Sequence, residues 1–121
     1  MSLTERLRAE FEEEMKTTRR LLERIPRADL GWKPHEKSMS LGELGQHVSD
    51  SSGWARAVVA QESFDASRVG PAPAVESVEQ LLEAFDRNVQ SAMEALAGVG
   101  EEDWDKSWTL RVGEEVKFTL P

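Results

Sequence analysis

Apolar residues recur at spacings of three and four along two long stretches of this chain, which is the period of an amphipathic α-helix. The first stretch follows Ser2 and stops before Pro26, because proline cannot continue a helix interior. The second follows Ser77 and stops at Gly98. Each serine is followed three residues later by Glu or Gln, which is the capping-box signature of a helix start. The pattern therefore predicts two long amphipathic helices within these limits.

A third helix is predicted between these two in the sequence, and it carries the main candidate functional residues. Ser40 and Glu43 form another capping box, so we expect a helix that begins at Leu41 and extends to Gln61. At about 100° per residue, one side of this helix collects apolar side chains, and we expect that side to be buried. Its members are Leu41, Leu44, Val48, Ala55, Val58 and Val59.

An imidazole and an indole flank this apolar side. His47 and Trp54 are seven residues apart and therefore lie nearly above one another along the helix axis. The same helix contains Gly42, Gly45 and Gly53, and each costs about 1 kcal/mol against alanine in a helix interior. Three such glycines indicate that another backbone or a ligand approaches the helix closely. The chemistry of this stretch then depends on what the imidazole of His47 faces.

The remaining segments are predicted to be connections and one hairpin. Residues 27–37 connect the first two helices, and we expect Trp32 to pack back against them. Residues 63–75 contain glycine and prolines and are predicted to be a loop. Residues 108–120 alternate apolar and polar on both sides of Gly113, which predicts a β-hairpin. We expect a three-residue turn, because that register pairs apolar residues with apolar residues. The expected pairs are Val112 with Val116, Leu110 with Phe118 and Trp108 with Leu120.

Length and cysteine content limit the class of protein. The 121 residues are enough for one domain, residues 1–121, with a single core. No run approaches the roughly 18 apolar residues of a membrane span, and no signal peptide opens the sequence, so we expect a cytoplasmic protein. The chain contains no cysteine. Any metal must therefore be held by imidazole and oxygen, and any thiol must be brought by the substrate.

The charge is unevenly distributed along the chain. The formal net charge is −8, from 23 acidic and 15 basic residues. Residues 1–60 contain ten side chains of each sign, whereas residues 61–121 contain thirteen acidic and five basic ones. The whole excess therefore lies in the second half. A nucleic-acid surface needs a basic patch, so this distribution argues against nucleic acid as a partner.

Three amphipathic helices and a hairpin form an incomplete set. In a helical bundle every apolar stripe packs on a partner, and each large apolar side chain left uncovered forfeits about 1.5–3 kcal/mol. Pro121 is a residue typical of the first turn of a helix. We therefore expect either a fourth helix beyond residue 121, so that the domain is truncated here, or a second chain that covers these faces.

Short motifs occur in order along the whole chain. They are Leu30-Gly31-Trp32-Lys33-Pro34-His35, Ser38-Met39-Ser40-Leu41-Gly42-Glu43-Leu44, His47, Gly53-Trp54-Ala55, Ser77-Val78-Glu79-Gln80-Leu81-Leu82, Glu101-Glu102-Asp103 before Trp104, and Phe118-Thr119-Leu120-Pro121. Each motif is short, but the ordered set resembles the DinB-like family of small metal-binding helical bundles. The resemblance implies an all-α fold, an up-down-down-up four-helix bundle of which three helices and a short C-terminal hairpin are present.

The resemblance also implies a metal-dependent enzyme, which is often a homodimer. Some members of the family transfer a low-molecular-weight thiol to an electrophilic small-molecule substrate. Three histidines of the family hold the metal, typically zinc or nickel: one lies midway along the second helix, and two form an H-x-x-x-H pair on the fourth. His47 matches the first histidine. The other two ligands are expected beyond residue 121, and His35 matches neither of them.

This ligand set would support more than one reaction. Three neutral imidazoles leave a divalent metal an open position for water or a thiol. A bound thiol becomes a thiolate nucleophile at neutral pH, whereas a bound water supports hydrolysis. The resemblance therefore implies a metal-dependent transferase, with a hydrolase on the same scaffold as an alternative. A further alternative is a non-enzymatic interaction or dimerisation module in which His47 is a structural core histidine.

Other residues could support or flank such a site. Ser51 lies one turn beyond His47 and is the best candidate for an outer-shell contact to a ligand. Trp54 is compatible with either a pocket or a core position. We expect Trp104 and Trp108 to be core residues, because buried aromatic area is their usual role. The acidic residues 101–105 have no ligand spacing and are expected to form a solvated loop.

Overall fold

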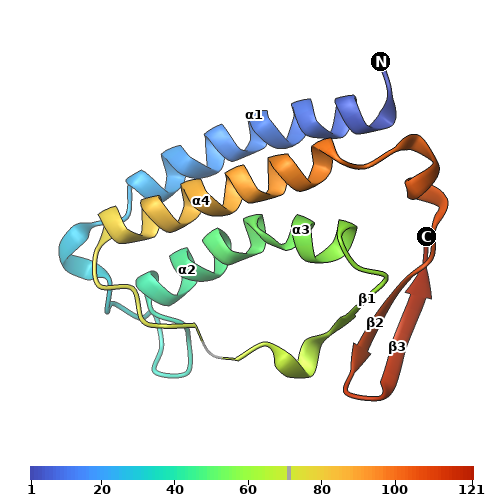
Figure 1. The fold of residues 1–121 in the computed structure, drawn as a ribbon. Helices are drawn as coiled ribbons and strands as arrows, with labels where there is room; N and C mark the ends of the chain where they lie inside the picture. The colour runs from blue at the N-terminus through green and yellow to red at the C-terminus, as the bar shows by residue number, and fades with distance from the viewer. Residues whose placement is uncertain (71) are drawn as a thin grey trace.

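The helix α4 (Val78–Ala97) is at the centre of the fold in the computed structural model, which describes residues 1–70 and 72–121. It packs against α1 (Leu3–Glu23) on one side and against α2 (Leu41–Ser52) and α3 (Trp54–Val59) on the other (Figure 1). The predicted first and last helices are therefore confirmed, with α1 ending two residues earlier than expected. None of the helices described here combines the length and the apolar composition needed to cross a bilayer.

The predicted helix starts are confirmed, with a complete capping box at two of the three; at α4, Ser77 Oγ accepts from the Gln80 N–H, but Gln80 Oε1 accepts from the Glu76 N–H instead of from Ser77. Ser2 Oγ accepts a hydrogen bond from the Glu5 backbone N–H, and Glu5 Oε2 accepts from the Ser2 N–H. Ser40 and Glu43 repeat the same reciprocal pair at the start of α2. These bonds satisfy backbone donors that have no partner within the first turn of a helix, and they fix where each helix begins.

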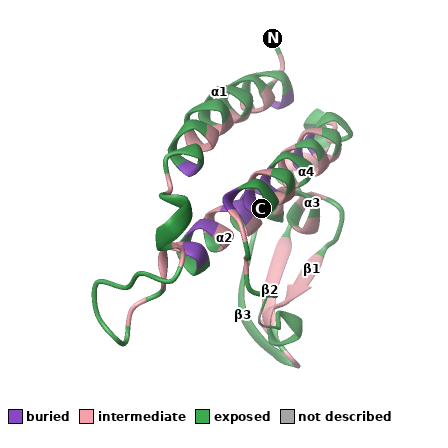
Figure 2. Cartoon of the chain, turned by 90° about the vertical axis from the view of Figure 1, so that its left-hand side faces the viewer, coloured by how far each residue is buried: buried purple, intermediate pink, exposed green. Residues whose placement is uncertain are grey.

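The core lies where α4 faces its neighbours. Leu81 and Phe85 of α4 and Leu22 of α1 are 1–2% exposed and form one cluster. The buried positions of the helices fall on α1, α2 and α4 (Figure 2). At the surface, Arg19 forms a bidentate contact with Asp86, with Nε–Oδ1 and Nη2–Oδ2 distances of 2.8 and 2.9 Å. Apolar packing therefore joins these helices, and an exposed ion pair adds to it.

The helix predicted from Leu41 to Gln61 is divided at Gly53, and the reason is a side chain of α4. Asn88 Nδ2 donates a hydrogen bond of 2.9 Å to the carbonyl oxygen of Ser49, which is the normal helical acceptor for the N–H of Gly53. The Gly53 N–H bonds instead to the Asp50 carbonyl. The helical i→i−4 hydrogen-bond pattern is thus interrupted at Gly53, and α3 begins at Trp54.

The prediction of which side of α2 is buried is confirmed only in part: Val48 packs against the core and Leu41 is half-buried, but the most deeply buried positions are small residues. The buried residues are Gly42, Gly45, Ser49 and Ser52, whereas Leu44 and Val58 of the predicted stripe are 49% and 43% exposed. Small residues occupy the buried side of α2 because they allow neighbouring parts of the chain to approach this helix closely. A Cβ atom on Gly45 would lie 2.8 Å from Leu81 Cδ2 and 3.0 Å from Ile25 Cδ1. The close approach predicted from the glycines is therefore confirmed, and protein atoms make it.

A three-stranded sheet lies at one end of the helices, in the order β1-β2-β3. The strands are β1 (Ser63–Asp65), β2 (Trp108–Val112) and β3 (Glu115–Leu120); β1 is parallel to β2, and β3 is antiparallel to it. The loop predicted over residues 63–75 is wrong in its first part, which forms β1 and a 3₁₀ turn, η2 (Ala66–Arg68). Pairing with a distant strand, rather than local pattern, creates β1. Pro71, which falls in the same predicted loop, lies outside the described residues.

The hairpin is confirmed, but its turn is not the predicted one. Gly113 and Glu114 form a two-residue turn in which Gly113 has a φ of 60°, so Val112 pairs with Glu115 rather than with Val116. An irregularity follows, since Leu110 pairs with Phe118 while Arg111 pairs with Val116. This bulge restores the predicted register, and the Trp108–Leu120 pair is also confirmed.

The fold is mostly helical, but it is not the complete four-helix bundle that was expected. Residues 1–70 and 72–121 contain three long helical segments, namely α1, α2 with α3, and α4. The predicted packing of Trp32 against the helices is wrong, because this residue is 55% exposed in the connection after η1 (Arg27–Asp29). The acidic residues predicted as a loop form a 3₁₀ helix, η3 (Glu101–Asp105).

Candidate functional site on α2 and α3

The imidazole of His47 lies on the exposed side of α2. Its ring packs edge-on against the indole of Trp54, with centroids 6.2 Å apart and an interplanar angle of 83°. The main-chain carbonyl of His47 accepts a hydrogen bond of 2.8 Å from Ser51 Oγ. Within the described part of the chain neither ring nitrogen of His47 has a hydrogen-bond partner. His47 is therefore not the hydrogen-bonded core histidine of the structural alternative, and its nitrogens are free to meet a ligand.

The neighbours of His47 form a continuous exposed surface. We call it the outer stripe; it consists of Leu44, His47, Ser51, Trp54 and Val58, which are spaced by three and four residues and are all exposed. At about 100° per residue the outer stripe lies on nearly the opposite side of the helix from the buried glycines and serines. The large side chains of the outer stripe therefore face solvent, whereas the glycines and serines lie on the buried side together with Val48, which packs against the core.

A carboxyl group adjoins the outer stripe. Asp50 lies three residues after His47, about one helical turn along. Burial raises the pKa of the Asp50 carboxyl, and the nearby charge of His47 acts in the opposite direction. Ser51, the expected outer-shell residue, is instead occupied by its bond to the main chain of His47.

The structure does not assemble a complete metal site from these residues. His35, the other histidine of the chain, lies in the connection before α2, where its Nδ1 accepts a hydrogen bond of 3.1 Å from the Lys37 N–H. Among residues 1–70 and 72–121, no group of three or more His, Cys, Asp or Glu side chains could hold a metal ion. The zinc or nickel expected from the family resemblance therefore does not fit the described residues alone.

The other tryptophans have separate roles. Trp104 Nε1 donates a hydrogen bond of 3.0 Å to Thr4 Oγ1, and Thr4 Oγ1 in turn donates to the Val99 carbonyl. This contact fixes η3 to the start of α1. The Trp108 ring lies beside Phe118, with centroids 6.2 Å apart, and its indole N–H is buried without a hydrogen-bond partner among the described residues. Both indoles therefore contribute to packing at the sheet end, and neither reaches His47.

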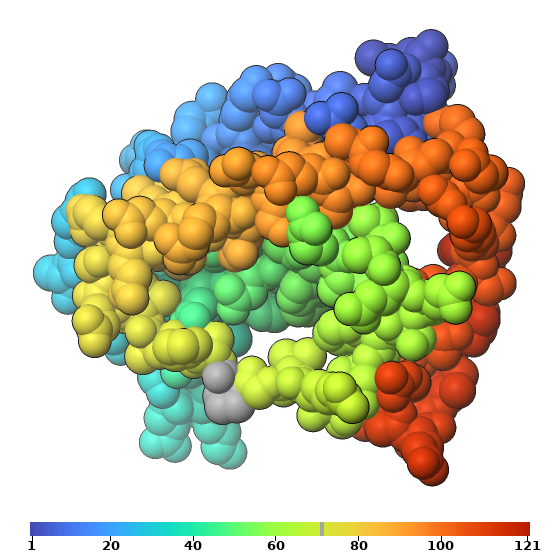
Figure 3. Space-filling view, in the orientation of Figure 1, coloured from blue at the N-terminus to red at the C-terminus, as the bar shows by residue number. Residues whose placement is uncertain are grey.

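A cavity of about 460 Å³ opens at the corner between the end of α3, η3 and the hairpin (Figure 3). Its walls include Val58, Trp104, Trp108, Phe118 and Leu120. Most of these side chains are apolar, and the ion pair between Lys106 and Asp103 lies at the same wall. His47 and Trp54 do not line this cavity, and Val58 is the one member of the outer stripe that reaches it.

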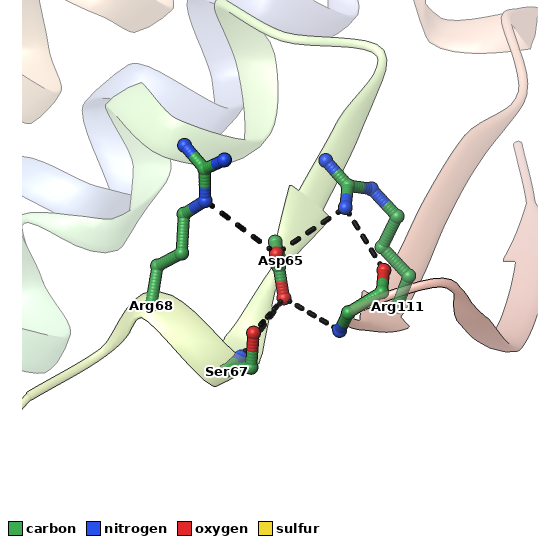
Figure 4. Close-up of polar contacts among 5 residues, drawn as sticks. Asp65, Ser67, Arg68 and Arg111 are labelled. Carbon is green, nitrogen blue, oxygen red and sulfur yellow. Dashed lines mark hydrogen bonds and ion pairs between the residues drawn. The ribbon is translucent and has the colours of Figure 1, made fainter.

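The sequence did not reveal a polar cluster at Asp65. Asp65 Oδ1 accepts hydrogen bonds from the Ser67 backbone N–H and Oγ and from the Gly113 N–H, at 3.0, 2.6 and 2.9 Å (Figure 4). Oδ2 lies 3.3 Å from Arg111 Nη1 and 3.6 Å from Arg68 Nε. We call this set the Asp65 clasp. The Asp-x-Ser sequence was a local signal for the turn, but nothing local indicated the contact with the hairpin.

The comparison with family models is consistent with this geometry. The model of the DinB superfamily matches residues 10–120, and the chain belongs to that superfamily. No curated protein and no solved structure matches the chain. The family assignment therefore rests on the family model, together with a mostly helical fold and a histidine at the middle of α2.

Proposed function

We propose that this chain acts in a metal-dependent transfer reaction of the DinB type, with a low-molecular-weight thiol and an electrophilic small molecule as substrates. His47 would supply one imidazole ligand to zinc or nickel. The observation that carries the proposal is the state of this ring, which is exposed and free of hydrogen bonds among the described residues. A structural histidine is normally hydrogen-bonded within its surroundings, so this state supports a ligand role.

The immediate surroundings suit an imidazole that meets a cation. The edge contact with Trp54 restricts the orientation of the ring, and the Asp50 carboxyl adds a negative charge about one turn away. A single imidazole and one carboxylate do not complete a coordination sphere. The proposal therefore requires ligands in addition to those of the described residues, and we derive no catalytic step from His47 alone.

Metal binding is the first test of this role. In a chain extended past residue 121, where the family resemblance leads us to expect the other two ligands, equilibrium dialysis against Zn²⁺ or Ni²⁺ should show bound metal that falls at least about tenfold in a His47→Ala variant. His35→Ala is the matched control, because it removes the other histidine without touching α2, and it should leave binding unchanged. Equal binding by the wild type and by His47→Ala would overturn the ligand role.

Activity measurements then separate the reaction classes. The protein would be assayed with glutathione and an activated aryl chloride for thiol conjugation, and with an aryl ester for hydrolysis, with and without a chelator. We expect conjugation that is lost with the chelator and in His47→Ala. Chelator-sensitive hydrolysis without conjugation would support a hydrolase instead. Absence of both reactions in a chain that binds the metal through His47 would reject these two reaction classes.

A further inference from the structure

A second cavity lies beside the Asp65 clasp. Its volume is about 470 Å³, which is within the range of small-molecule sites. We call it the clasp cavity; its wall includes Glu62, Asp65, Arg68, Val69 and Arg111. We propose that the clasp cavity binds a small organic acid whose single carboxylate lies between the guanidinium groups of Arg68 and Arg111.

Two cations share one carboxylate at the wall of this cavity. Arg111 Nη1 lies 3.3 Å from Asp65 Oδ2, and Arg68 Nε lies 3.6 Å from the same oxygen. Hydrogen bonds from Ser67 and Gly113 to Oδ1 lower the pKa of Asp65 to about 2, so this carboxyl group is ionised at neutral pH. The two guanidinium groups and the one carboxylate therefore leave one positive charge in excess.

Both guanidinium groups retain hydrogen-bond donors for a ligand. Each has five N–H donors in a planar fork. Arg111 Nη1 donates to the Gly113 carbonyl at 3.0 Å, whereas the 3.6 Å contact of Arg68 is too long for a hydrogen bond. Figure 4 shows the remaining terminal nitrogens of both groups on the side of Asp65 away from Ser67. A carboxylate on that side can accept from both arginines, and the planar fork suits carboxylate oxygens.

The two arginines are held to different degrees. The Arg111 side chain is 37% exposed and contacts both Asp65 and the hairpin turn, so it is a cation already fixed in place. The Arg68 side chain is 84% exposed, so a ligand must order it at a cost in side-chain entropy. We therefore expect a weak site, with a dissociation constant on the order of 1–10 mM, that depends on both charges.

Charge elsewhere in the chain favours a ligand with one negative charge over a polyanion. The formal net charge of −8 repels anions, and this repulsion grows with the charge of the ligand. It is largely screened beyond about 8 Å at physiological ionic strength, whereas the arginines act in direct contact. Glu62 is the other acidic residue of the described wall, and its charge opposes binding. Glu62→Gln should therefore tighten binding by about two- to threefold.

Titration with benzoate tests this site in the full chain. Nitrogen–proton correlation NMR at neutral pH and physiological ionic strength should show shifts of the Ser67 and Gly113 amides, because both donate to Asp65. Amides in the middle of α4 should not shift. Arg68→Gln should weaken binding at least about fivefold, since it removes one of the two charges. Arg87→Gln is the matched control, because it makes the same charge change on the exposed side of α4, and it should leave binding unchanged.

Two further probes test which chemistry is recognised. Benzamide has the shape of benzoate without its charge and should bind at least about fivefold more weakly. Inorganic phosphate should bind no more tightly than benzoate, because Val69 at the wall is 61% exposed and offers an apolar contact to the benzoate ring alone. Tighter binding of phosphate than of benzoate would overturn the choice of a carboxylate.

Several results would overturn the site itself. They are the absence of shifts with benzoate, equal affinity of the wild type and Arg68→Gln, equal affinity for benzamide and benzoate, and weaker binding by Glu62→Gln. His47 does not line the clasp cavity, so His47→Ala should bind benzoate as the wild type does. The outcome is therefore independent of the metal-binding test of His47.

Discussion

The contact between α2 and α4 and the attachment of the small sheet are stabilised in different ways. Between the helices, Gly45 admits Leu81 so closely that a single added carbon would lie 2.8 Å from it. At the sheet, the Asp65 carboxylate joins η2 to the hairpin turn through hydrogen bonds and neighbouring arginines. Burial of apolar surface is largely independent of pH, whereas a carboxylate loses its role when it is protonated. The two regions should therefore respond to different perturbations.

Truncation of the central aromatic residue should have the largest effect. Phe85 is 2% exposed and belongs to the cluster shared by α1 and α4. Replacing it with alanine removes the whole buried ring and leaves a cavity, so Phe85→Ala should lower the free energy of unfolding by about 3–5 kcal/mol. Urea denaturation followed by circular dichroism measures this loss. Phe118→Ala, at a position that is 44% exposed, should cost less than about 1 kcal/mol.

Overpacking of the contact between α2 and α4 should have the second-largest effect on the free energy of unfolding. In Gly45→Val the new side chain meets Leu81 and Ile25, both of which already pack in the core. We expect a loss of about 1–3 kcal/mol in the free energy of unfolding, because these neighbours must shift or adopt strained rotamers. Gly31→Val is the control, since nothing lies within 4 Å of a Cβ atom there. Equal stability of the two variants would show that the helices are not in close contact.

Neutralisation of the clasp should act locally rather than globally. In Asp65→Asn the side chain loses its charge toward Arg111 and one of its carboxylate oxygens. We expect faster amide hydrogen exchange in β1, β2 and β3, with exchange in the middle of α4 unchanged. Asp105→Asn, on exposed η3, is the matched control and should leave both regions as they are. Faster exchange throughout α4 would mean that the sheet and the core unfold together.

Acid should reproduce the effect of that substitution over a defined range of pH. The hydrogen bonds from Ser67 and Gly113 lower the pKa of Asp65 to about 2, from a usual value of 3.8. A lowered pKa stabilises the folded state above the usual value, and this contribution is lost as the pH falls from about 4 toward 2. The protection of the sheet amides, that is, their exchange rate compared with the intrinsic rate at the same pH, should fall over this range. The change should be absent in Asp65→Asn, and its persistence there would assign it to another carboxyl group.

Much of the helical part could be predicted because its signals are local. The capping serines and the spacing of apolar residues fixed the starts of α1, α2 and α4. The centre of the buried side of α2 could not be predicted in this way, because periodicity assumes that the large apolar residues are the most deeply buried ones. Here the missing side chains of Gly42 and Gly45 leave room for Leu30 and for Leu81, respectively. The break at Gly53 also depends on Asn88, a residue of another helix.

The candidate site was predictable in part for the same reason. The proximity of His47 and Trp54 follows from helix geometry alone, and the ring contact confirms it. The role of His47 as a metal ligand stays a prediction, since it depends on groups that helix geometry does not specify. The Asp65 clasp could not be predicted from the sequence, because it joins Asp65 to Gly113, which is 48 positions away along the chain.

The parallel pairing of β1 with β2 has a consequence for how this protein folds. β2 and β3 are neighbours in sequence, and a hairpin of this kind closes within microseconds. By contrast, the connection between β1 and β2 contains the whole of α4. The entropy cost of closing this long loop must therefore be met before the β1–β2 contacts can stabilise the chain. The first strand should therefore join last, after the central helix has docked. Any variant that delays docking of α4 should leave a transient hairpin with an open edge, and this is the species most exposed to aggregation.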